Sequence, residues 1–138
     1  MEMTMKWQEG LSFTGSNPSG QEVYISNEKD EQGKRTGFSP IQLLALGLGT
    51  CSGMDVVSIM QKKRQEIQDF DVKVNYERRK EHPTIWSEVN VQYIVTGKEI
   101  DPAALERSIQ LSVENYCAAY GMLSKSVEIT TSYKIIEA

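Results

Sequence analysis

Hydrophobic and polar residues alternate in three short segments near the start of the chain, at positions 3–7, 11–13 and 23–25. A period of two gives a β-strand one apolar face and one polar face. Gly10 and the NPSG segment at 17–20 separate the three segments, and residues of these types favour turns. The pattern therefore predicts a three-stranded antiparallel meander.

The sequence then passes from a charged stretch to an apolar one. Residues 27–37 contain charges and glycines without periodicity, which predicts a solvent-exposed loop. Ser39 can act as an N-cap, Pro40 suits the first helical position, and Gln42 completes a capping box. We therefore expect a long helix that ends near Lys63, where basic residues favour the negative pole of the helix dipole.

Two longer alternating segments, at 70–76 and 89–95, flank a turn at 81–83. They predict a long β-hairpin, because each segment can place its apolar residues on one face of a sheet. A final alternating segment at 127–135 predicts a closing strand.

A second helix is expected between the hairpin and the closing strand. Asp101 and Pro102 suit its start, and Gly121 suits its C-terminal cap. The apolar residues at helical spacing between these ends are Leu105, Ile109, Val113, Tyr116 and Tyr120. The order βββαββαβ predicts an α+β fold in which two long helices pack on one face of an antiparallel sheet. We expect the 138 residues to form a single domain, 1–138.

Charge and composition argue against several classes of function. The net charge of -4 arises from 15 basic and 19 acidic residues spread along the chain, so nucleic acid is not an expected partner. The start, MEMTMKWQEG, lacks an apolar segment of signal-peptide length, which predicts a cytoplasmic protein. Polar residues interrupt the longest apolar stretch, 41–60, which predicts a buried helix and no membrane partner. No His, Cys or carboxylate residues have metal-ligand spacing, so we expect neither a metal nor a cofactor.

The first predicted helix has an unusual number of glycines. Gly47, Gly49 and Gly53 lie in its interior, where each costs roughly 1 kcal/mol relative to alanine. Small residues let another backbone approach closely, and apolar residues surround most of the helix. We therefore expect a homodimer with this helix at or near the subunit interface; the alternative is a central helix buried within one monomer.

Cys51 and Cys117 are the only cysteines and the candidate catalytic residues. Cys51 lies in the first helix, and Cys117 follows Val113 by four residues in the second, so both thiols can face one core. They are either small buried hydrophobic residues or a peroxidatic and resolving pair. A bridge between them requires Cα atoms roughly 4.4 to 6.8 Å apart. Asp55 is expected at the surface or in a cap, because a nearby carboxylate disfavours a thiolate.

Two segments around the cysteines resemble the OsmC/Ohr superfamily. Residues 37–57, GFSPIQLLALGLGTCSGMDVV, resemble its first cysteine helix, and ENYC at 114–117 followed by a closing strand resembles its second. The order of strands and helices agrees with that of the superfamily over nearly the whole chain. The residues around both cysteines are most similar to those of the YhfA-like branch. The resemblance implies an OsmC-like fold in an intertwined homodimer with two long helices at its centre.

The resemblance also implies thiol-dependent reduction of organic hydroperoxides in oxidative stress defence. Cys51 matches the peroxidatic thiol and Cys117 the resolving thiol, with a small hydrophobic hydroperoxide as substrate and a dithiol reductant that the sequence does not identify. Three positions depart from the peroxidases. Ile41 stands where they carry a glutamate, Asn17 where they carry an arginine, and Ala118 where a proline usually follows the second cysteine.

The departures leave the enzymatic activity open. An arginine beside the thiol holds it as a thiolate, and its loss argues against fast peroxidase chemistry. One alternative is a non-catalytic dimer that binds a small hydrophobic ligand in the cleft around Cys51. Another is a thiol protein that acts on a different electrophile, such as a reactive sulfur species.

Overall fold

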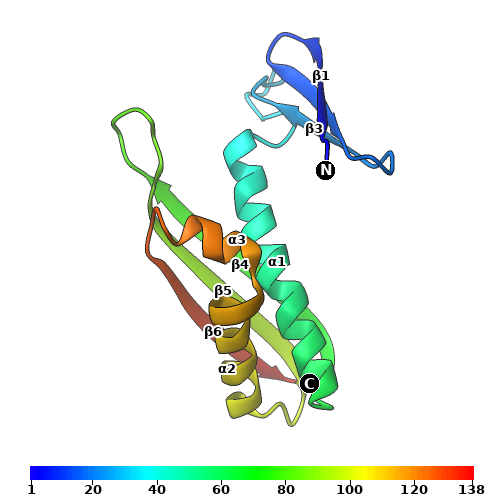
Figure 1. Ribbon diagram of the computed structural model, residues 1–138, viewed down its shortest axis with the longest axis vertical. Coiled ribbons are helices and arrows are strands. Elements are labelled where there is room, and N and C mark those ends of the chain that lie inside the picture. Colours follow the sequence, from blue (N-terminus) through cyan, green and yellow to red (C-terminus); the bar gives the residue numbers. More distant parts are fainter. The chain divides into compact units, whose positions relative to one another are not determined.

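The computed structural model describes residues 1–138 as two compact units, Met1–Ala45 and Leu46–Ala138 (Figure 1). Helix α1, Pro40–Lys62, begins in the first unit and continues through the second. The chain combines strands and helices, so the α+β class is confirmed. The single-domain organisation stays a prediction.

The first unit contains the predicted meander. Strands β1 (Thr4–Glu9), β2 (Ser12–Ser16) and β3 (Glu22–Ser26) pair antiparallel in the order β1-β2-β3. The register places Trp7 opposite Phe13 and Phe13 opposite Ile25, so the alternation of the sequence gathers apolar side chains on one face. The predicted meander is confirmed.

The two faces of this sheet differ. The polar face is satisfied within the unit, because Ser12 Oγ and Ser26 Oγ lie 2.8 Å apart and both residues are buried. The apolar face stays open to solvent, with Met5 63% and Trp7 61% exposed. A three-stranded sheet with one uncovered apolar face needs a further surface to cover it.

The predicted capping box starts α1. Ser39 Oγ accepts the backbone N–H of Gln42 at 3.1 Å, and Gln42 Oε1 accepts the N–H of Ser39 at 2.9 Å. By length and composition α1 could cross a membrane, a test that a core helix also passes. Leu48, Val56 and Met60 of α1 are fully buried within the chain, as expected of a core helix.

The second unit contains a mixed sheet in the order β4-β5-β6. β4 (Glu66–Arg78) and β5 (Trp86–Lys98) form the predicted long hairpin. β6 (Ile129–Glu137) pairs parallel with β5, so the prediction of a purely antiparallel sheet is wrong for this strand. The chain crosses over through helices between β5 and β6, and such a connection brings the next strand back in the same direction.

The predicted second long helix is broken into three parts. α2 (Pro102–Leu111) is followed by a π-helical turn, η1 (Ser112–Tyr116), and by α3 (Ala118–Leu123). Cys117, between the last two, has an extended backbone with φ -76 and ψ 103. The wide turn shifts the helical phase by a residue, so Tyr116 is 63% exposed and not part of the apolar stripe. Gly121 lies inside α3 and caps no helix.

Helices α1 and α2 lie on the same face of the β4-β5-β6 sheet (Figure 1). Two glycines set the approach of α1 to β4. A Cβ built on Gly49 would lie 2.9 Å from Cγ2 of Val74, and one on Gly53 would lie 3.1 Å from Cγ2 of Val72. Gly47 has no neighbour within 4 Å. The close approach expected from these small residues is therefore made within one chain at Gly49 and Gly53. The large side chains that are fully buried in the second unit include Leu48, Val56, Met60, Val91, Tyr93, Val95 and Leu105.

Candidate functional site

The structure places the two cysteines on different elements of the second unit. Cys51 is half-buried near the middle of α1, and Cys117 is buried at the start of α3. Both are free thiols. Cys117 acts as the N-cap of α3, since its Sγ accepts the backbone N–H of Tyr120 at 3.2 Å. The helix break therefore makes Cys117 a capping residue, whereas the sequence predicts a position beside the apolar stripe of a continuous helix.

The two thiols are brought together within one chain. Burial raises the pKa of Cys117 to about 11, and the neighbouring Cys51 raises it further, whereas the N–H of Tyr120 lowers it. The effect of Cys51 on the pKa of Cys117 means that the two thiols are neighbours.

A buried chain of hydroxyl groups lies beside the thiols. Tyr93 of β5 and Ser52 of α1 are joined at 2.5 Å, and Ser52 and Ser112 of η1 at 2.8 Å. Ser112 Oγ donates to Asp55 Oδ2 of α1 at 2.9 Å. Tyr93, Ser52 and Ser112 are fully buried. We call Tyr93, Ser52, Ser112 and Asp55 the hydroxyl chain.

The hydroxyl chain has one direction. Ser112 has a single hydroxyl proton, which it donates to Asp55, so Ser52 must donate to Ser112. Ser52 then accepts from Tyr93, whose pKa is raised to about 12 by burial and which therefore keeps its proton. Each buried hydroxyl donates toward the Asp55 carboxylate, so every polar group in the series is satisfied.

The sequence analysis did not predict the roles of Tyr93, Ser52 and Ser112 in the hydroxyl chain, and it placed Asp55 wrongly. Asp55 is half-buried and accepts a hydrogen bond from Ser112, so the expectation of a surface or capping position is wrong. The spacing of Ser52 and Asp55 places them on one helix face beside Cys51, and this was the available signal. Ser112 and Tyr93 come from distant elements, and only the π-helical turn and the register of β5 bring them there.

The three departures from the peroxidases have local explanations. Asn17 Oδ1 accepts the N–H groups of Ser19 at 3.1 Å and Gln21 at 3.0 Å, so it builds a turn. Ile41 is half-buried in the first turn of α1. Ala118 occupies the first position of α3, where proline is also favoured. Within one chain no cationic side chain hydrogen-bonds to either sulfur; the Cys117 sulfur accepts the backbone N–H of Tyr120.

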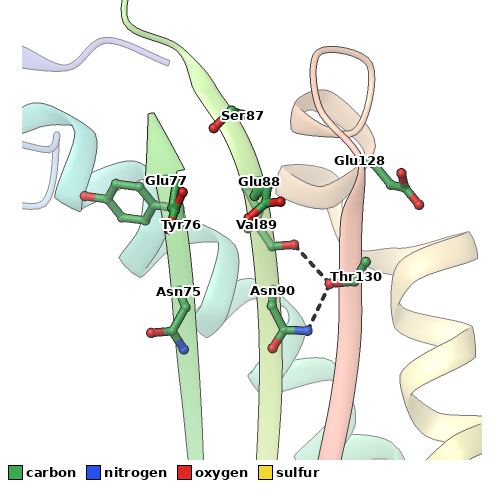
Figure 2. A pocket seen from close by; sticks show the side chains of 9 residues that line it. All are labelled: Asn75, Tyr76, Glu77, Ser87, Glu88, Val89, Asn90, Glu128 and Thr130. Atoms are coloured by element: carbon green, nitrogen blue, oxygen red, sulfur yellow. Dashed lines mark hydrogen bonds between the residues drawn. The ribbon is translucent and has the colours of Figure 1, made fainter. Parts of the chain in front are cut away.

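A pocket of about 650 Å³ lies elsewhere, on the face of the β4-β5-β6 sheet opposite the helices (Figure 2). Asn75, Asn90 and Thr130 stand in a row on its three strands, and Asn90 Nδ2 donates to Thr130 Oγ1 at 2.9 Å (Figure 2). Glu77 of β4 and Glu88 of β5 pair with each other one row further along these two strands (Figure 2). The lining contains no cysteine and no cation, so the pocket is separate from the thiol pair.

Comparison with known proteins agrees with this architecture. The sequence model of the OsmC-like protein family matches residues 31–132. Protein YhfA of Escherichia coli strain K12 is 39% identical over 138 residues, all of both chains. A hypothetical protein from Aquifex aeolicus has a similar crystal structure, with a TM-score of 0.88 and 28% identity over 99% of this chain and 96% of that chain. The organic hydroperoxide resistance protein OhrB of Bacillus subtilis shares the fold, with a TM-score of 0.65 and 18% identity over 96% of each chain.

The α+β fold, shared with these proteins over nearly the whole chain, defines a protein of the OsmC/Ohr type. The chain belongs to the OsmC-like protein family. The resemblance noted around the two cysteines is thereby confirmed.

Proposed function

We propose that this protein reduces organic hydroperoxides, with Cys51 as the attacking thiol and Cys117 as the resolving thiol, in defence against oxidative stress. The observation that carries the proposal is the placement of a buried Cys117 thiol beside the more exposed Cys51 thiol of the same chain. Names among the structural neighbours, such as the organic hydroperoxide resistance protein OhrB, support the substrate class.

The roles follow from the different surroundings of the thiols. Cys117 is 5% exposed and its pKa is raised to about 11, so it stays protonated at neutral pH. Cys51 is half-buried and therefore more exposed than Cys117, so it is the thiol that a substrate can reach first.

The reaction balances in two steps and a reduction. The Cys51 thiolate attacks the terminal oxygen of the hydroperoxide, the O–O bond breaks, and the alcohol leaves after taking a proton, which gives a Cys51 sulfenic acid. The Cys117 sulfur then attacks the Cys51 sulfur, and a disulfide and water form. An external dithiol reduces the disulfide, and two thiols are restored on the protein while the external dithiol is oxidised.

Apolar surface beside Cys51 supports an organic substrate. Gly47 and Met54, one helical turn before and after Cys51, lie on the same side of α1. Met54 is 72% exposed, and Gly47 has open space beside it. A small hydrophobic peroxide can cover this surface with its organic group while its O–O bond reaches the Cys51 sulfur.

We propose further that the protein is a cytoplasmic homodimer. The apolar face of β1-β2-β3 is uncovered in one chain, and a second copy can cover it through an isologous interface. The reducing cytoplasm supplies dithiols that regenerate the thiol pair. Sedimentation at several protein concentrations tests the dimer, and a monomer at all concentrations would contradict it.

Single-cysteine variants test the assigned roles. We expect reduced wild-type protein to lose both thiols on addition of an organic hydroperoxide. Cys51→Ser should consume no peroxide, whereas Cys117→Ser should accumulate a sulfenic acid that a sulfenic-acid-specific probe captures. Equal consumption by both variants would contradict the roles, and unchanged thiols in the wild type would favour a dimer that only binds a hydrophobic ligand.

A further inference from the structure

We infer that Ser112 is the positioning residue that holds the two thiols within reach of each other. Ser112 is the only residue whose polar groups join both cysteine-bearing segments. Its carbonyl oxygen accepts the backbone N–H of Cys117 at 2.8 Å, and its hydroxyl bonds to Ser52 and Asp55 of α1. The use of this alignment in the reaction, disulfide formation between Cys51 and Cys117, rests on the proposed function.

The carbonyl oxygen of Ser112 bonds to the segment that carries Cys117, and its hydroxyl bonds to the helix that carries Cys51. The bond from the Cys117 N–H closes the π-helical turn, so it fixes the point at which the chain leaves η1 and presents the Cys117 thiol. Ser52 follows Cys51 directly and Asp55 follows it by one turn, so the hydroxyl of Ser112 contacts α1 on the Cys51 segment. A single serine thus connects the backbone of one thiol to the helix of the other.

The remaining members of the hydroxyl chain keep this connection rigid. Ser112 is fully buried, so no water competes for its hydroxyl. Ser52 is anchored to Tyr93 of the central strand β5, and the Asp55 carboxylate accepts from Ser112. A fully satisfied buried network favours one arrangement of the elements that it joins.

A buried serine in the preceding helix gives a matched control. Ser108 of α2 is also fully buried, but its hydroxyl donates at 2.7 Å to the carbonyl oxygen of Ala104 in the same helix. Ser108→Ala therefore removes a buried hydroxyl of the same kind without removing a hydrogen bond to α1. Ser112→Ala removes both bonds to α1 and leaves the backbone bond to Cys117 in place.

The test is the equilibrium between the protein dithiol and oxidised glutathione, which yields the protein disulfide and two reduced glutathione molecules. This equilibrium measures how well the fold holds the sulfurs together, whatever the protein reduces. We expect Ser112→Ala to lower the constant for disulfide formation about tenfold, since two hydrogen bonds that align the segments are lost. Ser108→Ala should leave the constant unchanged within about twofold.

Asp55→Asn distinguishes the hydrogen bond that residue 55 accepts from the negative charge that it carries. The asparagine oxygen can still accept from Ser112, so we expect the constant for Asp55→Asn to stay within about threefold of the wild-type value. Equal constants for Ser112→Ala and Ser108→Ala would overturn the positioning role. A tenfold loss in Asp55→Asn would overturn it as well, because the charge of Asp55 would then set the equilibrium.

The positioning role of Ser112 and the proposed peroxidase activity can fail independently in these experiments. A protein that does not react with hydroperoxide but shows the expected order of constants retains the positioning role and loses the peroxidase activity. Near-ultraviolet circular dichroism of each variant shows that the fold is kept. Should Ser112→Ala not fold, Ser52→Ala removes one of the two bonds to α1, and an unchanged constant in that variant would overturn the role.

Discussion

Replacing Gly49 with alanine tests how closely α1 approaches β4. Alanine gains about 1 kcal/mol of helix propensity over glycine. Against this, the new Cβ would lie 2.9 Å from Cγ2 of Val74 and 3.4 Å from Cγ1 of Val72, whereas carbon atoms pack best at about 3.5 to 4.0 Å. Valine is stiff at χ1, so the helix must move. Such overpacking costs about 1 to 3 kcal/mol, and we expect a net loss of about 1 kcal/mol in the free energy of unfolding.

Gly121 gives the matched control for this substitution. It lies inside α3, and a Cβ built there meets nothing within 4 Å, so Gly121→Ala should gain about 1 kcal/mol. Urea unfolding at one fixed protein concentration measures both variants, because dimerisation makes stability concentration-dependent. The expected difference between them is about 2 kcal/mol. A Gly49→Ala variant as stable as Gly121→Ala would refute the close packing of α1 on β4.

Two further predictions concern the interior of the second unit. Tyr93→Phe leaves the buried Ser52 hydroxyl without its donor and should lower the free energy of unfolding in urea by about 1 to 3 kcal/mol. Tyr133→Phe, at an exposed hydroxyl, should change it by less than about 0.5 kcal/mol. Equal effects of the two substitutions would contradict the buried network. Burial raises the pKa of Cys117 to about 11, so its contribution to stability is present below the unfolded value of about 8.5 and is lost as the pH rises toward 11. Thiolate absorbance of Cys51→Ser, in which Cys117 is the sole thiol, should therefore begin to rise only above the ordinary range, and a midpoint at or below about 8.5 would contradict the burial.

Local signals in the sequence predicted most of the elements. Alternation located the strands of both sheets, and Ser39 with Gln42 located the start of α1, because these patterns depend only on neighbouring residues. The parallel pairing of β6 with β5 was not predicted, since it depends on the path of the chain between them. The break at Cys117 was also missed, because the apolar spacing through Tyr116 imitates a continuous helix.

The candidate site was predicted only in part. The sequence predicted that Cys51 and Cys117 face one core, and the influence of Cys51 on the pKa of Cys117 agrees with that prediction. The sequence places Ser52 and Asp55 on one face of a helix, but it does not predict their partners Ser112 and Tyr93, which lie on distant elements. Their pairing needs α1, β5 and η1 in place, and it is a property of the tertiary structure.

The most direct test of the thiol pair is mass spectrometry of the reduced protein after one equivalent of an organic hydroperoxide. We predict a disulfide that joins the peptides of Cys51 and Cys117 from the same chain, together with one alcohol released per chain. Unmodified cysteines, or a disulfide that forms only between chains, would contradict the account.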